Sequence, residues 1–231
     1  MSLEPPTGQA ESAVPHASPL KPWTGRHAVS AGLFEIRPRF LPADVRPVLD
    51  DDLDCIIGYY RRFGARAHLF DLDANACWVW EETQPLPPPE KRDPVLVVGG
   101  LWVENARGVT ALGLTGTGAP LSASVTASLR SRFAALARSP LLYSEAALAR
   151  MEDPQRFLPV HILRLAISHG ERAAPPLAQP DARRYLARML VRRQPFMVNL
   201  VTAHEDTTIL DFEYWRYADT MPAAAWRTST A

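Results

Sequence analysis

The stretch FMVNLVTA-HEDT-TILDFEYWRY occupies residues 196–217. Apolar and polar side chains alternate on both sides of the polar segment 204–207, a pattern typical of two antiparallel strands joined by a turn. The chain is therefore predicted to close with a β-hairpin. The same reasoning predicts a second hairpin upstream, with strands over 67–72 and 77–81 around a turn at 73–75.

The rest of the chain predicts a mixture of helices and strands. Apolar residues recur at spacings of three and four from Val45 to Tyr60, which favours an amphipathic helix that Asp44 opens and Gly64 ends. The stretch 141–168 contains helix-breaking prolines and fits either a helix or a strand. The remaining expected elements are strands over 33–37, 95–103 and 109–114, a helix after Gly118 that Pro140 ends, and a helix over 180–193.

This order of elements predicts an α+β fold, with a mixed, mostly antiparallel sheet flanked by helices. The chain of 231 residues suits a single domain, expected over 32–220. The proline-rich segment 1–31 has too few apolar residues to form a core and predicts a disordered tail, and 221–231 predicts a flexible C-terminus. Within the tail, Trp23 is either a docking anchor for a partner or packs back on its own domain.

Charge and hydropathy argue against two classes of protein. The 25 basic and 25 acidic residues balance, whereas proteins that bind nucleic acid or anionic membranes carry a basic surface. The longest nearly apolar run, 94–103, is about half of what a membrane-spanning helix needs. Without a secretion signal, a cytoplasmic location is expected. The only lysines are Lys21 and Lys91, and such an arginine bias favours a GC-rich, bacterial genome.

The spacing of the histidines and cysteines does not favour a metal site or a catalytic thiol. The six histidines are far apart and no CxxC pair is present, so no metal site is expected. The carboxylates of 50–54 are interpreted as a solvated helix face, and Cys55 and Cys77 as reduced thiols. A thiol hydrolase with Cys77 as nucleophile, His204 as base and Asp211 as orienter is one alternative, although a cysteine that enters a strand lacks the help of a helix dipole.

The segment GLTGTGAPLS, residues 113–122, leads from a predicted strand through a glycine-rich turn into a predicted helix. Backbone amides in such a turn can hold a phosphate, aided by the partial positive charge of the helix N-terminus. The lysine of a nucleotide-binding P-loop and the third glycine of a dinucleotide fingerprint are both missing. The alternative is a plain connection with Ser122 or Ser124 as the helix cap.

The segment 33–136 resembles GNAT-type acyltransferases. Phe34-Glu35-Ile36-Arg37-Pro38, followed by Pro42-Ala43-Asp44-Val45, looks like the first strand and helix of that family, and 97–103 is similar to its central Val-Gly strand. The glycine turn follows at the place where the family binds the pyrophosphate of acyl-CoA, although it begins with Thr115 where the family has Arg or Gln.

The resemblance implies transfer of an acyl group, such as acetyl, from acyl-CoA as cosubstrate to an amine acceptor. A general base would take the proton of the amine as it attacks the thioester. The residues implied are Gly116, Thr117 and Gly118 for the pyrophosphate, and Glu104, Tyr143 or Glu81 as the base.

A non-catalytic role is the alternative function. Aromatic residues occupy alternating positions on the predicted strands, so that Trp215 and Tyr217 share the face opposite Tyr214. One set has to fill the core, and the other is then exposed near arginines, a combination common in protein-binding surfaces. The chain would then be an adaptor, an accessory subunit or a specific chaperone with a protein partner. The aromatic residues concerned are Trp78, Trp80, Trp102, Tyr214, Trp215 and Tyr217.

Overall fold

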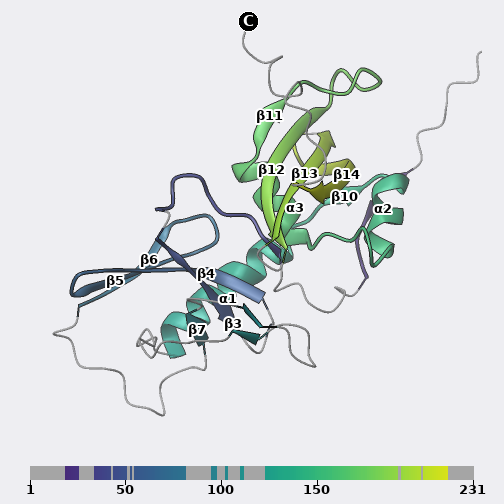
Figure 1. Ribbon diagram of the computed structural model, residues 1–231. Helices are drawn as coiled ribbons and strands as arrows, with labels where there is room; N and C mark the ends of the chain where they lie inside the picture. The colour runs from purple at the N-terminus through teal and green to yellow at the C-terminus, as the bar shows by residue number, and fades with distance from the viewer. Residues whose placement is uncertain are drawn as a thin grey trace, which may run out of the picture.

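The computed structural model describes residues 19–25, 34–42, 44–50, 53, 55–81, 95–97, 102–103, 110–111, 123–191, 194–203 and 205–217. Within these ranges the chain forms three α-helices and two large sheets, the α+β fold that the sequence predicts. In Figure 1 the green and yellow strands β11–β14 stand in the upper half, and the blue strands β3–β6 lie in the lower half with helix α1. Only one strand pair, β10 with β14, is parallel among those described.

The first sheet is five-stranded and fully antiparallel, with the order β6-β5-β4-β3-β7. The predicted hairpin over 67–81 is confirmed as β5 and β6. A separate two-stranded sheet is formed by β8 (Trp102–Val103) and β9 (Thr110–Ala111). The five strands are β3 (Arg46–Asp50), β4 (Cys55–Phe63), β5 (Arg66–Phe70), β6 (Ala76–Glu81) and β7 (Val95–Val97).

The second sheet has the order β1-β10-β14-β13-β12-β11, and β2 also pairs with β12. The predicted closing hairpin is confirmed as β13 and β14, and the predicted first strand as β2. Its strands are β1 (Lys21–Pro22), β2 (Phe34–Glu35), β10 (Leu142–Tyr143), β11 (Glu171–Ala173), β12 (Arg183–Val191), β13 (Gln194–Ala203) and β14 (Thr208–Arg216).

Helices α1 (Ala123–Ala137), α2 (Glu145–Glu152) and α3 (Val160–His169) lie between β9 and β11 in the chain. Helix α1 confirms the helix predicted after Gly118, and the stretch left open over 141–168 contains β10, α2 and α3. Ser144 caps α2 by accepting a hydrogen bond from the Ala147 amide at 3.1 Å. Helix α3 is buried along most of its length, as expected of a helix that is apolar on nearly all sides.

The helix predicted from Asp44 to Gly64 is wrong, because this segment forms the β3–β4 hairpin. Both faces of β4 are buried: Tyr59 packs into one core cluster, while Ile57 and Tyr60 pack into another. A strand covered on both sides is apolar at nearly every position, so apolar residues also recur at helical spacings. Asp50, expected on a solvated face, is fully buried.

The helix predicted over 180–193 is also wrong, because residues 183–191 form β12. Tyr185, Ala187 and Met189 all belong to the larger core cluster, at a spacing of two. The alternate positions include Arg184 and Arg188 as well as Leu186 and Leu190, so the stretch also fits the pattern of a helix with one polar face.

The N-terminal segment that the sequence assigns to a disordered tail includes described residues at 19–25. Lys21 and Pro22 pair with β10, and Trp23 packs against the larger core cluster. The rest of 1–31, like 221–231, lies outside the described residues. Cys55 is buried and Cys77 is half-buried, and no disulfide joins them.

Two core clusters share helix α1. The larger cluster fills the space between α3 and the second sheet, with Leu163 and Phe212 enclosed, and it also includes Ile56 and Tyr59 of the first sheet. The smaller lies between α1 and the first sheet, where Leu129 is completely buried. Phe133 of α1 packs against both clusters, so this helix joins the two halves of the fold.

A buried ion pair fixes α1 on the first sheet. The fully buried carboxylate of Asp50 accepts hydrogen bonds from Arg130 Nε at 2.5 Å and Arg130 Nη2 at 3.1 Å. A third comes from the Leu53 amide at 3.2 Å. A buried carboxylate has to be compensated in this way, because its transfer out of water is costly.

Replacing Arg130 with methionine, which keeps a long apolar side chain, leaves the Asp50 carboxylate buried without its counter-charge. We expect Arg130→Met to lower the free energy of unfolding by about 3 kcal/mol, measured by urea denaturation. Arg61→Met is the matched control, because Arg61 pairs with Asp44 at the surface and its loss should leave the urea midpoint nearly unchanged. Equal losses in the two variants would contradict the role of the buried pair.

Candidate functional site

The site residues implied by the acyltransferase resemblance are not brought together by the described part of the chain. Glu81 lies on β6, where its carboxylate forms an ion pair with Arg66 at 2.9 Å. Tyr143 lies on β10 in the other sheet. Outside the described residues lie Gly116, Thr117, Gly118 and Glu104.

Tyr143 is suited to donate a hydrogen bond and poorly suited to act as a base. Its side chain is buried, and its hydroxyl has no hydrogen-bond partner among the described residues. Burial raises the pKa of this phenol well above its usual value, while the nearby charge of Arg164 acts in the opposite direction. The hydroxyl therefore keeps its proton at neutral pH.

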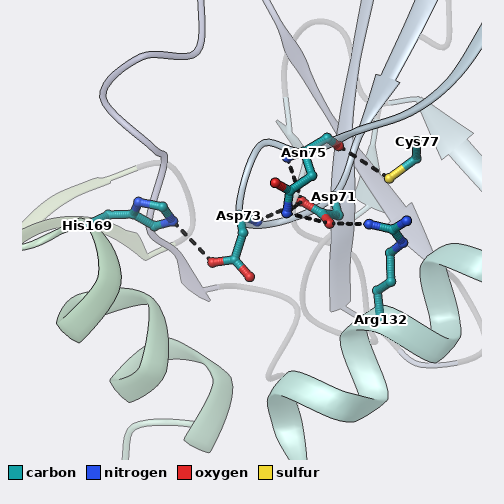
Figure 2. A network of polar contacts seen from close by, with 6 residues as sticks. All are labelled: Asp71, Asp73, Asn75, Cys77, Arg132 and His169. Atoms are coloured by element: carbon teal, nitrogen blue, oxygen red, sulfur yellow. Dashed lines mark hydrogen bonds and ion pairs between the residues drawn. The ribbon is translucent and has the colours of Figure 1, made fainter. Parts of the chain in front are cut away.

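Among the described residues, the Asp71 carboxylate, directly after β5, accepts hydrogen bonds from several groups at once (Figure 2). Its carboxylate accepts hydrogen bonds from the backbone amides of Asp73 and Asn75, at 3.1 and 2.8 Å, and from the side-chain amide of Asn75. Arg132 of α1 donates a further one at 2.7 Å. These bonds hold the β5–β6 turn, in which Ala74 has a positive φ of 64°, against α1. With all its acceptor positions in use, Asp71 is a structural group.

Cys77 borders this network without being activated by it. Its thiol donates to the Asn75 carbonyl at 3.3 Å. Burial raises the pKa of the thiol, the charge of Asp71 raises it further, and Arg132 acts in the opposite direction. Of the partners expected for a thiol hydrolase, Asp211 lies on β14 and binds Arg150, and His204 lies outside the described residues. The arrangement around the sulfur therefore favours the thiol over the nucleophilic thiolate.

Figure 2 also shows a contact from the same turn to the other half of the fold. His169, at the end of α3, places Nε2 3.3 Å from an Asp73 carboxylate oxygen, without the alignment of a hydrogen bond. The imidazole is mostly enclosed and meets the ring of Phe40 edge-on. This contact joins the end of α3 to the first sheet.

The second sheet has a face that points away from the larger core cluster, and we call it the outer face. Arg188, Met197 and Trp215 lie side by side there on β12, β13 and β14, because they are register partners. Tyr217, just beyond β14, is 37% exposed, and the Arg188 guanidinium lies 5.9 Å from the centre of its ring. This geometry is that of a cation–π contact.

A polar row crosses the same three strands beside these residues. Arg184 donates to the side-chain oxygen of Asn199 at 2.8 Å, and Asn199 donates to Glu213 at 2.9 Å. Met197 is only 2% exposed, although it belongs to neither core cluster. The outer face thus combines aromatic, aliphatic and arginine side chains with a polar border that satisfies its own hydrogen bonds.

The sequence locates part of this face. The placement of Trp215 and Tyr217 opposite Tyr214 is confirmed, since Tyr214 packs against the larger core cluster. The arginines of β12 were missed as members of the face because 180–193 was assigned to a helix. The available signal was the alternation of Tyr185 and its neighbours at a spacing of two.

Comparisons with protein-family models, with curated proteins and with solved structures find no match for this chain. Any assignment of function therefore depends on the geometry of the chain itself. In the described ranges, no cluster of three or more His, Cys, Asp or Glu side chains is arranged to hold a metal ion. No helix of that part of the chain has the length and apolar character needed to span a membrane.

The raised pKa of Cys77 predicts slow alkylation at neutral pH, because only the thiolate reacts. In a Cys55→Ala variant, where Cys77 is the remaining cysteine, the rate of reaction with iodoacetamide should rise with a midpoint above that of free cysteine measured beside it. Adding Arg132→Gln should move the midpoint higher still, because the opposing positive charge is lost. A midpoint below that of free cysteine would return Cys77 to the list of candidate nucleophiles.

Proposed function

We propose that this protein is a non-catalytic binding module that holds a partner protein on the outer face of its second sheet. The observation that carries the proposal is the exposed pair Arg188 and Tyr217 with the half-buried Trp215 beside it, on a face that neither core cluster uses. Met197, which lies between Arg188 and Trp215 in the ladder, is itself buried and supports them from below. Helices α2 and α3 contribute their buried residues to the larger cluster on the opposite face.

The residue types on this face are those that dominate protein interfaces. Trp, Tyr and Arg are enriched among the side chains whose removal weakens binding most. The three-stranded antiparallel ladder β12–β14 fixes their positions, so little ordering is required on association. The net charge of zero fits a protein partner better than a nucleic acid.

The polar row supplies a basis for choosing among partners. Arg184, Asn199 and Glu213 bind one another, and a docked surface has to match or replace these hydrogen bonds. A partner that buries the row without doing so leaves polar groups unsatisfied, which is unfavourable. The aromatic and arginine residues would thus supply affinity, and the row would supply specificity.

The face is tested by comparing two arginine–aromatic pairs. Arg188→Ala with Tyr217→Ala removes the pair on the outer face, and Arg61→Ala with Phe63→Ala removes a similar pair on the first sheet, where the guanidinium lies 5.5 Å from the ring. A partner that co-purifies stoichiometrically should be retained by the second variant and lost by the first. We expect its Kd to rise by roughly thirtyfold, corresponding to about 2 kcal/mol.

A thermal unfolding series with acetyl-CoA separates this proposal from acyl transfer, which the resemblance predicts. At about a hundredfold above its Kd, a specific ligand adds about 2.7 kcal/mol to the free energy of unfolding. We expect no such gain. A saturable gain, or a partner retained equally by both pair variants, would contradict the binding-module proposal.

A further inference from the structure

A cleft of about 380 Å³ lies between the N-terminal segment and the start of the second half of the chain. Trp23 and its neighbours form one wall, and the residues between α1 and β10 form the other, with Val160 of α3 at the boundary. This volume lies in the range of small-molecule sites. The cleft is separate from the outer face, and neither the resemblance nor the binding-module proposal makes use of it.

Two residues that line the cleft carry a buried hydrogen-bond donor without an acceptor among the described residues. These donors are the indole Nε1–H of Trp23 and the hydroxyl of Tyr143. Tyr143 as a whole is only 1% exposed. Buried donors are nearly always paired, and an unpaired one is costly, so two such groups at one cleft indicate a missing acceptor.

The charges around the cleft specify the kind of acceptor. Arg138 lines the cleft and is exposed, and the described residues of the lining include no carboxylate. Arg164 stands behind Tyr143, where its Nη2 donates to the Pro140 carbonyl at 2.7 Å while its Nε has no partner in the described part of the chain. The remainder of the lining is largely apolar and includes Pro22, Leu141 and Val160.

We infer that this cleft binds a small carboxylic acid with an apolar body. The carboxylate accepts hydrogen bonds from Trp23 and Tyr143 and lies near the positive charge of Arg138, and the apolar body lies against Leu141 and Val160. Ionised acceptors form stronger hydrogen bonds than neutral ones, which favours a carboxylate over an amide or alcohol of the same shape.

Access to the two donors requires a small movement of the wall that contains Trp23. Both atoms are shielded from water in the empty cleft. The wall is attached to the second sheet through the two-residue pairing of β1 with β10. A short pairing at the edge of the sheet opens more easily than the central strands. The wall can therefore move enough to turn both donors toward the ligand, with the Trp23 indole still in the cleft and the domain folded.

Calorimetric titration of the full-length protein at neutral pH tests the inference, with benzoate and hexanoate as probes. We expect saturable binding of at least one of them, and at least tenfold weaker binding of the matching neutral amide. Tyr143→Phe and Arg138→Gln should each weaken carboxylate binding at least tenfold. Arg39→Gln is the matched control, because Arg39 is equally a surface arginine but pairs with Glu171 away from the cleft, and it should have no effect.

Thermal unfolding provides an independent readout of the unpaired hydroxyl. Removing an unsatisfied buried group does not destabilise a protein, so Tyr143→Phe should leave Tm unchanged or raise it. Three results would each overturn the inference: neither carboxylate binds, binding is indifferent to Tyr143→Phe and Arg138→Gln, or Tyr143→Phe lowers Tm by several degrees. None of them bears on the partner-binding test, which uses residues of the outer face.

Discussion

Two aspartates of the first sheet are removed from water, and helix α1 supplies the charge that each of them requires. Arg130 forms an ion pair with Asp50, and Arg132 forms one with Asp71, so the helix is fixed to both β3 and the β5–β6 turn. Apolar packing alone would tolerate small rotations of α1, since it has little directional preference. Ion pairs with defined hydrogen-bond geometry hold the helix in one orientation, because a rotation would break the hydrogen bonds. The position of α1 in turn sets where Phe133 meets the two core clusters.

The parts of the fold that sequence reasoning predicts are those where local pattern and tertiary environment agree. In β14, Phe212 is buried, Glu213 is exposed and Tyr214 packs against the larger core cluster, so the alternation is visible along the chain. In β4 that agreement is lost, because Tyr59 and Tyr60 are both buried, on opposite faces. In β12 the outward arginines, and in β3 the buried Asp50, contradict what composition suggests. Such positions become intelligible only when the partner strand or helix is known.

The same contrast applies to the candidate sites. Trp215 and Tyr217 were placed on one face by simple alternation, which holds in any strand. The cleft beside Trp23 was beyond prediction, because it brings together residue 23 and residues 137–143, which are distant in sequence. Tyr143 was singled out as a base, yet its burial gives it the character of a donor. The chemistry of a side chain depends on its surroundings, and those follow from contacts that no local pattern contains.

The pairing of β2 with β12 has a consequence for how the chain assembles during synthesis. Residues 34–35 leave the ribosome long before their partners at 190–191, whereas the hairpins of the first sheet find their partners within a few residues. The early hairpins can therefore form while translation continues, and β2 has to wait for the last third of the chain. In that interval the backbone edge of β2 that later pairs with β12 remains open to solvent and to neighbouring nascent chains.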